Sequence, residues 1–92
     1  MSQVVVIVPP PLRKFVSGKT HVSVEAATVR QALAAFASDS DALRGYIFDQ
    51  DEGLRPFVRV FVGGKPATIR PDCEEPIGDG AEMTILLALA GG

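Results

Sequence analysis

Two apolar segments near opposite ends of the chain constrain its fold more than any other feature. Residues 3–8 read QVVVIV and residues 82–89 read EMTILLAL, and both compositions are typical of strands. The first segment ends at Pro9, Pro10 and Pro11, which cannot donate hydrogen bonds to a sheet. We therefore expect a long strand at each end of the sequence, both near the centre of a single sheet.

An amphipathic helix is predicted between these strands. Thr28 and Gln31 have the spacing of a capping box, in which two side chains bind free backbone amides at the start of a helix. Terminal strands that lie side by side would be parallel, and this helix would then be the crossover that packs on one face of the sheet. An apolar stripe at helical spacing suits that packing, and it consists of Val29, Ala32, Leu33, Phe36 and Ala37.

Shorter strands are predicted around two turns. A turn signal at residues 17–19 precedes alternating valines, and Gly63-Gly64 follows the run FVRVFV at residues 57–62. Pro66 limits the strand after the second turn, and residues 39–56 are expected to form turns and a loop. The fold class is therefore α+β, a β-grasp (ubiquitin-like) fold with a mixed four- to five-stranded sheet and one main helix on one face.

The composition fits one small domain. The chain has 92 residues, 47% of them hydrophobic, and a net charge of −2, so no general attraction to nucleic acid is expected. We expect a domain over residues 1–89 and a flexible Ala-Gly-Gly tail over residues 90–92. The apolar run near the N-terminus is too short for a signal peptide or a membrane span, so we expect a cytoplasmic location without membrane partners.

Few side chains suit catalysis or metal binding. One cysteine, Cys73, and one histidine, His21, are too few for an intramolecular disulfide or a tetrahedral Cys/His metal site. Asp72 and Glu74 flank Cys73 and disfavour its thiolate, so we expect low reactivity. No acid–base pair, nucleophile triad or phosphate-binding loop is recognisable, and the protein is expected not to be an enzyme.

Motifs along the whole chain carry a family resemblance. They are, in order, VPPPLR, TVRQAL, FVRVFVGGK, IGDGAEMTIL and the final ALAGG. This ordered set resembles the small bacterial ubiquitin-like sulfur carriers of cysteine, molybdopterin and thiamin biosynthesis. The similarity is greatest to the carriers that serve cysteine synthases. Thiamin-type carriers lack room for residues 39–56, and molybdopterin-type carriers often have prolines where this chain has Leu87-Ala88-Leu89.

The resemblance implies a function for the last residue. In such carriers an E1-like enzyme uses ATP and magnesium to adenylate the terminal carboxylate, here that of Gly92, and a sulfur donor then converts it to a thiocarboxylate. Ala90 and Gly91 are small enough to enter a narrow active-site channel. The partners implied are that E1-like enzyme, a sulfur-accepting enzyme such as a cysteine synthase homologue, and a metalloprotease that releases the product. The carrier itself binds no cofactor and acts as a co-substrate.

Other interpretations of the tail remain open at this point. A ubiquitin-like protein modifier would need the same activated carboxylate on Gly92, and so would the small subunit of a molybdopterin synthase. A passive β-grasp interaction domain would not use the tail at all. The last residues would then simply be a frayed chain end, as is common at termini.

A partner surface is predicted on the sheet face that the helix leaves open. Strand alternation places Phe57, Arg59 and Phe61 on that face, together with Leu86 of the last strand. A contiguous apolar patch there would mark an interface. The alternative is that residues 39–56 fold over these side chains and bury them. A second candidate surface is acidic: Asp79, Glu82 and neighbouring acids would either steer the carrier to a basic activator or be ordinary solvated side chains.

Overall fold

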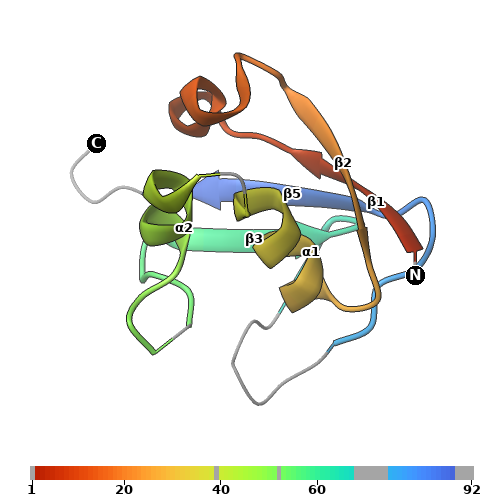
Figure 1. Ribbon diagram of the computed structural model, residues 1–92. Coiled ribbons are helices and arrows are strands. Elements are labelled where there is room, and N and C mark those ends of the chain that lie inside the picture. The colour runs from red at the N-terminus through yellow and green to blue at the C-terminus, as the bar shows by residue number, and fades with distance from the viewer. Residues whose placement is uncertain (1, 39, 52, 68–74, 89–92) are drawn as a thin grey trace.

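The computed structural model describes residues 2–38, 40–51, 53–67 and 75–88. Its strands form one five-stranded sheet in the order β2-β1-β5-β3-β4, and the helices α1 and α2 lie on one face of it (Figure 1). The predicted β-grasp class is confirmed. The strands are β1 (Ser2–Ile7), β2 (His21–Ala26), β3 (Val58–Val62), β4 (Lys65–Pro66) and β5 (Glu82–Leu87), and the helices are η1 (Pro10–Val16), α1 (Val29–Ala37) and α2 (Asp41–Ile47).

The two terminal strands lie side by side at the centre of the sheet. β1 and β5 are parallel, with Val5 opposite Glu82 and Ile7 opposite Thr84. β2 is antiparallel to β1 on one side, and β3 is antiparallel to β5 on the other. Two parallel neighbours need a crossover connection, and the chain between them includes α1, as the sequence predicted.

The predicted capping box starts α1. The Gln31 amide donates to Thr28 Oγ1 at 3.1 Å, and the Ala27 amide donates to Gln31 Oε1 at 2.9 Å. The whole predicted stripe of α1 is buried. It packs against the covered face of the sheet, where Met83 is 0% and Ile85 1% exposed.

Two helical elements go beyond the sequence prediction. η1 is a 3₁₀ helix whose first turn contains Pro10 and Pro11, and it ends at Ser17, which has a positive φ of 57°. α2 occupies a region expected to be turn and loop. The Ser40 hydroxyl accepts from the Leu43 amide at 3.2 Å, and Leu43 and Ile47, one turn apart, are both buried. Burial of these two side chains stabilises a helix that is too short to form alone.

Several predictions fall outside the described residues. Cys73, the boundary of the tail at residue 89, and the tail residues Ala90, Gly91 and Gly92 are among them. Within the described part of the chain, no helix is long and apolar enough to span a membrane.

Candidate partner interface and tail exit

The last described residue is held at the end of β5. The Ala88 amide donates to the Phe57 carbonyl oxygen at 2.7 Å, one position beyond the pair formed by Leu87 and Val58. This bond extends the pairing of β3 and β5 past the strand ends. The chain that continues toward Gly92 therefore starts from a fixed point on the sheet.

The open face of the sheet carries a row of partly exposed side chains, and Leu86 extends it toward this exit. Ile7, Thr84 and Phe61 lie in one row across β1, β5 and β3. Leu86 lies two residues after Thr84 in β5, nearer to the exit, and is 48% exposed, a high value for a leucine. Since Met83 and Ile85 point to the helices, strand alternation turns Thr84 and Leu86 outward. We call Ile7, Phe61, Thr84 and Leu86 the open-face patch.

Arg59 adds a cation beside the patch. It lies opposite Leu86, and its side chain is exposed. Its guanidinium donates to the carbonyl oxygens of Pro56 and Val58, which lie toward the exit. The predicted residues Arg59, Phe61 and Leu86 are thus neighbours on the face without helices.

Phe57 lies elsewhere than predicted. It precedes β3, which begins at Val58, and although its carbonyl still pairs with Ala88, its ring packs against a helix and not beside Arg59 and Phe61. Its ring is half-buried and makes an edge contact with Tyr46 of α2, with 5.6 Å between the ring centroids. The alternative in which residues 39–56 cover the predicted aromatic residues therefore applies to Phe57, while Leu86 stays exposed. Phe57 serves the exit through its backbone carbonyl.

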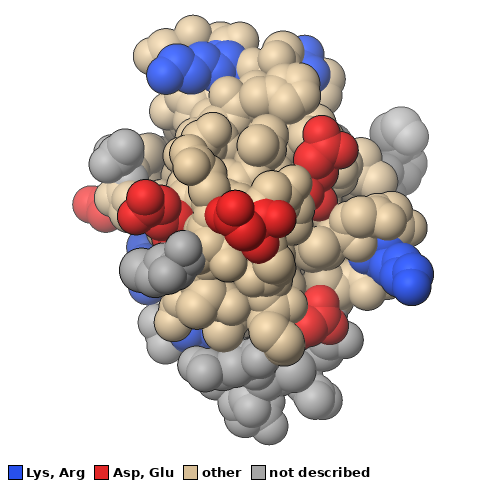
Figure 2. All heavy atoms as spheres, turned by 90° about the vertical axis from the view of Figure 1, so that its right-hand side faces the viewer, with Lys and Arg blue, Asp and Glu red and all other residues tan. Residues whose placement is uncertain are grey.

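The acidic residues lie at the opposite end of the sheet from the exit. The Asp79 carboxylate accepts from the Gln3 amide at 2.7 Å, and Glu25 pairs with Gln3 across β1 and β2. Glu82 is the first residue of β5, whereas the exit follows its last residue. Figure 2 shows acidic side chains over this end, where β1 and β5 begin. Asp79 and Glu82 are close to the tail in sequence, but the length of β5 separates them from Ala88.

Of the two remaining candidates, Cys73 and His21, only His21 is among the residues described. His21 is exposed, and its Nδ1 lies 2.9 Å from Thr20 Oγ1. No cluster of three His, Cys, Asp or Glu side chains that could hold a metal occurs among the residues described. Two features of the interface were not predicted: Ile7 as part of the patch, and the bond from Ala88 to Phe57. The register of β1 against β5 would have identified Ile7, since it fixes the neighbour of Thr84.

The chain is similar in sequence and in structure to several known proteins. No family model matches the sequence. A protein of Archaeoglobus fulgidus named as a candidate sulfur carrier is 28% identical over 75 residues, which cover 82% of this chain and 85% of that protein. A chain of the BexX/CysO complex of Amycolatopsis orientalis is 29% identical with a TM-score of 0.82, and the match covers 97% of this chain and 99% of that chain. The predicted resemblance to ubiquitin-like sulfur carriers is confirmed.

A second solved structure extends the likeness to a protein named as a modifier. The small archaeal modifier protein SAMP1 of Haloferax volcanii has a TM-score of 0.82 and 26% identity, and the match covers 99% of this chain and all of that one, 100%. Like this chain, all three proteins are matched over most of their length. The resemblance therefore applies to the whole β-grasp domain, including β5 and the exit.

Proposed function

We propose that this protein is a sulfur carrier that transfers sulfur from a thiocarboxylate on Gly92. The observation that carries the proposal is the exit: the Ala88 amide bonds to the Phe57 carbonyl at 2.7 Å, close to Leu86, an apolar side chain that is 48% exposed. Such an arrangement suits a protein that delivers its C-terminal residues into the active site of a partner. The likeness to sulfur carriers supports the same assignment.

The proposed chemistry has two steps on one carbon. The Gly92 carboxylate is ionised at neutral pH, so its carbon is a poor electrophile until it is activated. In the first step one carboxylate oxygen attacks the α-phosphorus of ATP; pyrophosphate leaves and an acyl-adenylate forms. A hydrosulfide sulfur then attacks the carbonyl carbon, AMP leaves with the electrons of the broken C–O bond, and loss of the sulfur-bound proton leaves the thiocarboxylate. The first reaction takes place on an E1-like enzyme, which holds ATP and magnesium. The carrier supplies the carboxylate and acts as a co-substrate.

The open-face patch is the proposed docking surface for that enzyme and for the acceptor of the sulfur. Leu86 and Phe61 supply apolar area, and Arg59 supplies a cation near the exit. A small apolar centre with a charged neighbour is a common composition for an interface. The Amycolatopsis relative was solved in a complex with BexX, which supports binding of a partner enzyme. By the resemblance, the acceptor is a cysteine synthase homologue or another enzyme that builds sulfur-containing metabolites.

An exchange assay tests the activation step. The full chain is mixed with an E1-like adenylyltransferase, ATP, magnesium and labelled pyrophosphate, and label entering ATP is measured. We expect exchange with the full chain and none with a variant that lacks Gly92. The full chain and the variant should unfold at the same temperature. Equal exchange by the two chains would rule out Gly92 as the activated residue.

A second candidate function is protein modification, which the likeness to SAMP1 favours. It shares the adenylate but ends in an isopeptide bond between Gly92 and a lysine of another protein. An N-terminally tagged chain expressed in cells distinguishes the two functions. Tagged adducts of higher mass that survive denaturation and thiol reductants, and that disappear without Gly92, would establish the modifier; their absence favours the sulfur carrier.

A further inference from the structure

The two outer strands of the sheet, β2 and β4, differ in how well their open edges are protected. β4 is two residues long and ends at Pro66, which has no N–H to offer to another strand. Short edge strands and proline are two devices by which proteins prevent edge-to-edge pairing. β2 is six residues long and contains no proline. The β2 edge is therefore the one that can accept a further strand.

Alternate residues of β2 direct their backbone groups away from β1. The Val8 amide donates to the Thr20 carbonyl at 2.9 Å, which identifies this pair as hydrogen-bonded. Hydrogen-bonded and non-hydrogen-bonded pairs alternate along an antiparallel ladder. The N–H and C=O groups of His21, Ser23 and Glu25 consequently point to the outer edge.

Opposite charges flank this row of outward groups. Lys19 lies in the turn before β2, where its amide donates to the Val16 carbonyl at 3.1 Å. Glu25 is the fifth residue of β2, and both charged side chains are exposed. Positions 19 and 25 are equally far from Val22 in the sequence. If β2 pairs antiparallel with a copy of itself about Val22, each Lys19 therefore lies opposite Glu25 of the other copy.

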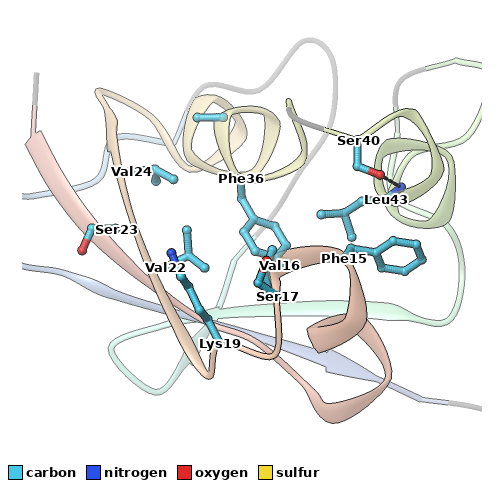
Figure 3. Close-up of a pocket in the computed structure, with 11 residues that line it drawn as sticks. Phe15, Val16, Ser17, Lys19, Val22, Ser23, Val24, Phe36, Ser40 and Leu43 are labelled. Atoms are coloured by element: carbon cyan, nitrogen blue, oxygen red, sulfur yellow. Dashed lines mark hydrogen bonds between the residues drawn. The ribbon is translucent and has the colours of Figure 1, made fainter.

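Apolar side chains beside the edge are incompletely covered. A groove with a volume of about 420 Å³ lies between β2, α1 and η1. Figure 3 shows Phe36 of α1 directed into it, with Val22 and Val24 on its β2 side. These two valines are half-buried, although they pair with the fully buried Val6 and Val4 of β1. A strand added at the β2 edge would shield them from water.

We propose that the protein forms a two-fold symmetric homodimer through its β2 edges. The two β2 strands pair antiparallel, and Val22 faces Val22 of the second copy in a non-hydrogen-bonded pair. His21 of each copy exchanges backbone hydrogen bonds with Ser23 of the other. Lys19 of each copy lies beside Glu25 of the other, and the two five-stranded sheets become one.

Charge selects this register among the symmetric ones. Only residues with outward groups can form the new hydrogen-bonded pairs, so the nearest symmetric alternatives place His21 against itself or Ser23 against itself. The first alternative opposes Lys19 to Ser23, and the second opposes Glu25 to His21. The register centred on Val22 opposes both lysines to glutamates, and cross-strand pairs of opposite charge stabilise a sheet.

The dimer leaves the tail exits of both copies accessible. β1 separates β2 from β5, so Ala88 lies away from the joined edges. The two-fold axis is perpendicular to the joined sheet, which places the helices of both copies on one face and both open-face patches on the other. The dimer is independent of the proposed sulfur chemistry, and its tests do not involve Gly92.

Sedimentation velocity tests the association. We expect the average mass of the full chain to rise toward that of two chains between about 1 μM and about 1 mM. Lys19→Glu and Glu25→Lys each oppose like charges and should weaken the dimer at least about tenfold. An equal mixture of these two variants should dimerise again, because each chain then supplies the charge that the other lacks. Lys65→Glu on β4 is the matched control and should have no effect.

Disulfide cross-linking tests the register. In a Cys73→Ser background, the introduced cysteine is the only thiol of the chain. Val22→Cys should form a disulfide between two copies, because the Cα atoms of a non-hydrogen-bonded pair lie about 4.5 Å apart. Lys65→Cys on the β4 edge should cross-link at least about tenfold more slowly, since it would depend on random collisions. The charge variants, which are at exposed positions, test the dimer even if Val22→Cys is unfolded.

Three results would overturn the proposal. The mass of a single chain at every concentration would mean that any strand at the β2 edge comes from another protein. A dimer that Leu86→Ala abolishes and Lys19→Glu leaves unchanged would assign the interface to the open-face patch. Faster cross-linking of Ser23→Cys than of Val22→Cys would contradict the register centred on Val22.

Discussion

Ile85 and Leu86 are adjacent residues with opposite environments. Ile85 is 1% exposed and packs among the valines and helices of the core, while Leu86 is 48% exposed on the open face. Strand alternation alone predicts this contrast from the sequence. It does not predict the position of Phe57, because that residue precedes the first residue of β3, Val58, and its ring contacts Tyr46 of α2, a helix that the sequence did not predict.

Truncation of these two neighbours should have opposite effects. Leu86→Ala should change the free energy of unfolding by less than about 0.5 kcal/mol, because a largely exposed side chain loses little burial. It should weaken binding to the activating enzyme by about 1–2 kcal/mol. Ile85→Ala should cost about 2–5 kcal/mol of stability through the cavity that it leaves.

Urea denaturation and calorimetric titration measure the two quantities. Ile85→Ala is the matched control, since it changes the same strand by a similar volume on the other face. A loss of stability in Leu86→Ala as large as in Ile85→Ala would mean that Leu86 is buried in solution. Unchanged partner affinity in Leu86→Ala would remove the open-face patch from the interface.

Whole elements differ in how far the sequence predicted them. The capping residues Thr28 and Gln31 and the helical stripe predict α1 directly, and the apolar terminal segments predict the parallel pair of β1 and β5. α2 was missed because its seven residues contain only two core side chains, Leu43 and Ile47. Its N-cap, Ser40, is visible in the sequence, but a short helix depends on tertiary contacts that local patterns do not contain.

Under the proposed function, β5 is also the element from which the tail extends. Two glycines inserted between Ala88 and Leu89 would move Gly92 away from the exit by up to about 7 Å along the chain. The insertion lies beyond the bond from Ala88 to Phe57, so the thermal unfolding temperature should not change. Activation of Gly92 should slow at least about tenfold, because the distance from the end of β5 to the Gly92 carboxylate would no longer match the distance from the partner's docking surface to its active site.

The same two glycines inserted at the Gly63-Gly64 turn provide the control. That turn lies at the other end of β5, where the Gly63 amide bonds to the Glu82 carbonyl at 3.2 Å. The control insertion should leave the activation rate unchanged. Equal activation rates of the unchanged chain, the chain with the insertion after Ala88 and the control would show that activation does not depend on the distance from β5 to Gly92.

In the whole molecule, β5 connects the acidic surface to the exit. The acids around Gln3 lie at the start of the strand, the exit lies at its end, and the open-face patch lies between them at Thr84 and Leu86. The sequence predicted an acidic surface around Asp79 and Glu82, but it could not show that β5 runs from those acids to the exit. Only the topology, with Glu82 at the start of the strand and Leu87 at its end, separates them.

The intact mass of the protein reports directly on the chemistry proposed for Gly92. The full chain is incubated with an E1-like enzyme, ATP, magnesium and sulfide, and its mass is compared with that of a chain lacking Gly92. The account predicts that one oxygen is replaced by sulfur in the full chain, that fragmentation locates the sulfur on Gly92, and that the shortened chain is unchanged. An unchanged mass with activators that adenylate the chain, or sulfur on any other residue, would contradict it.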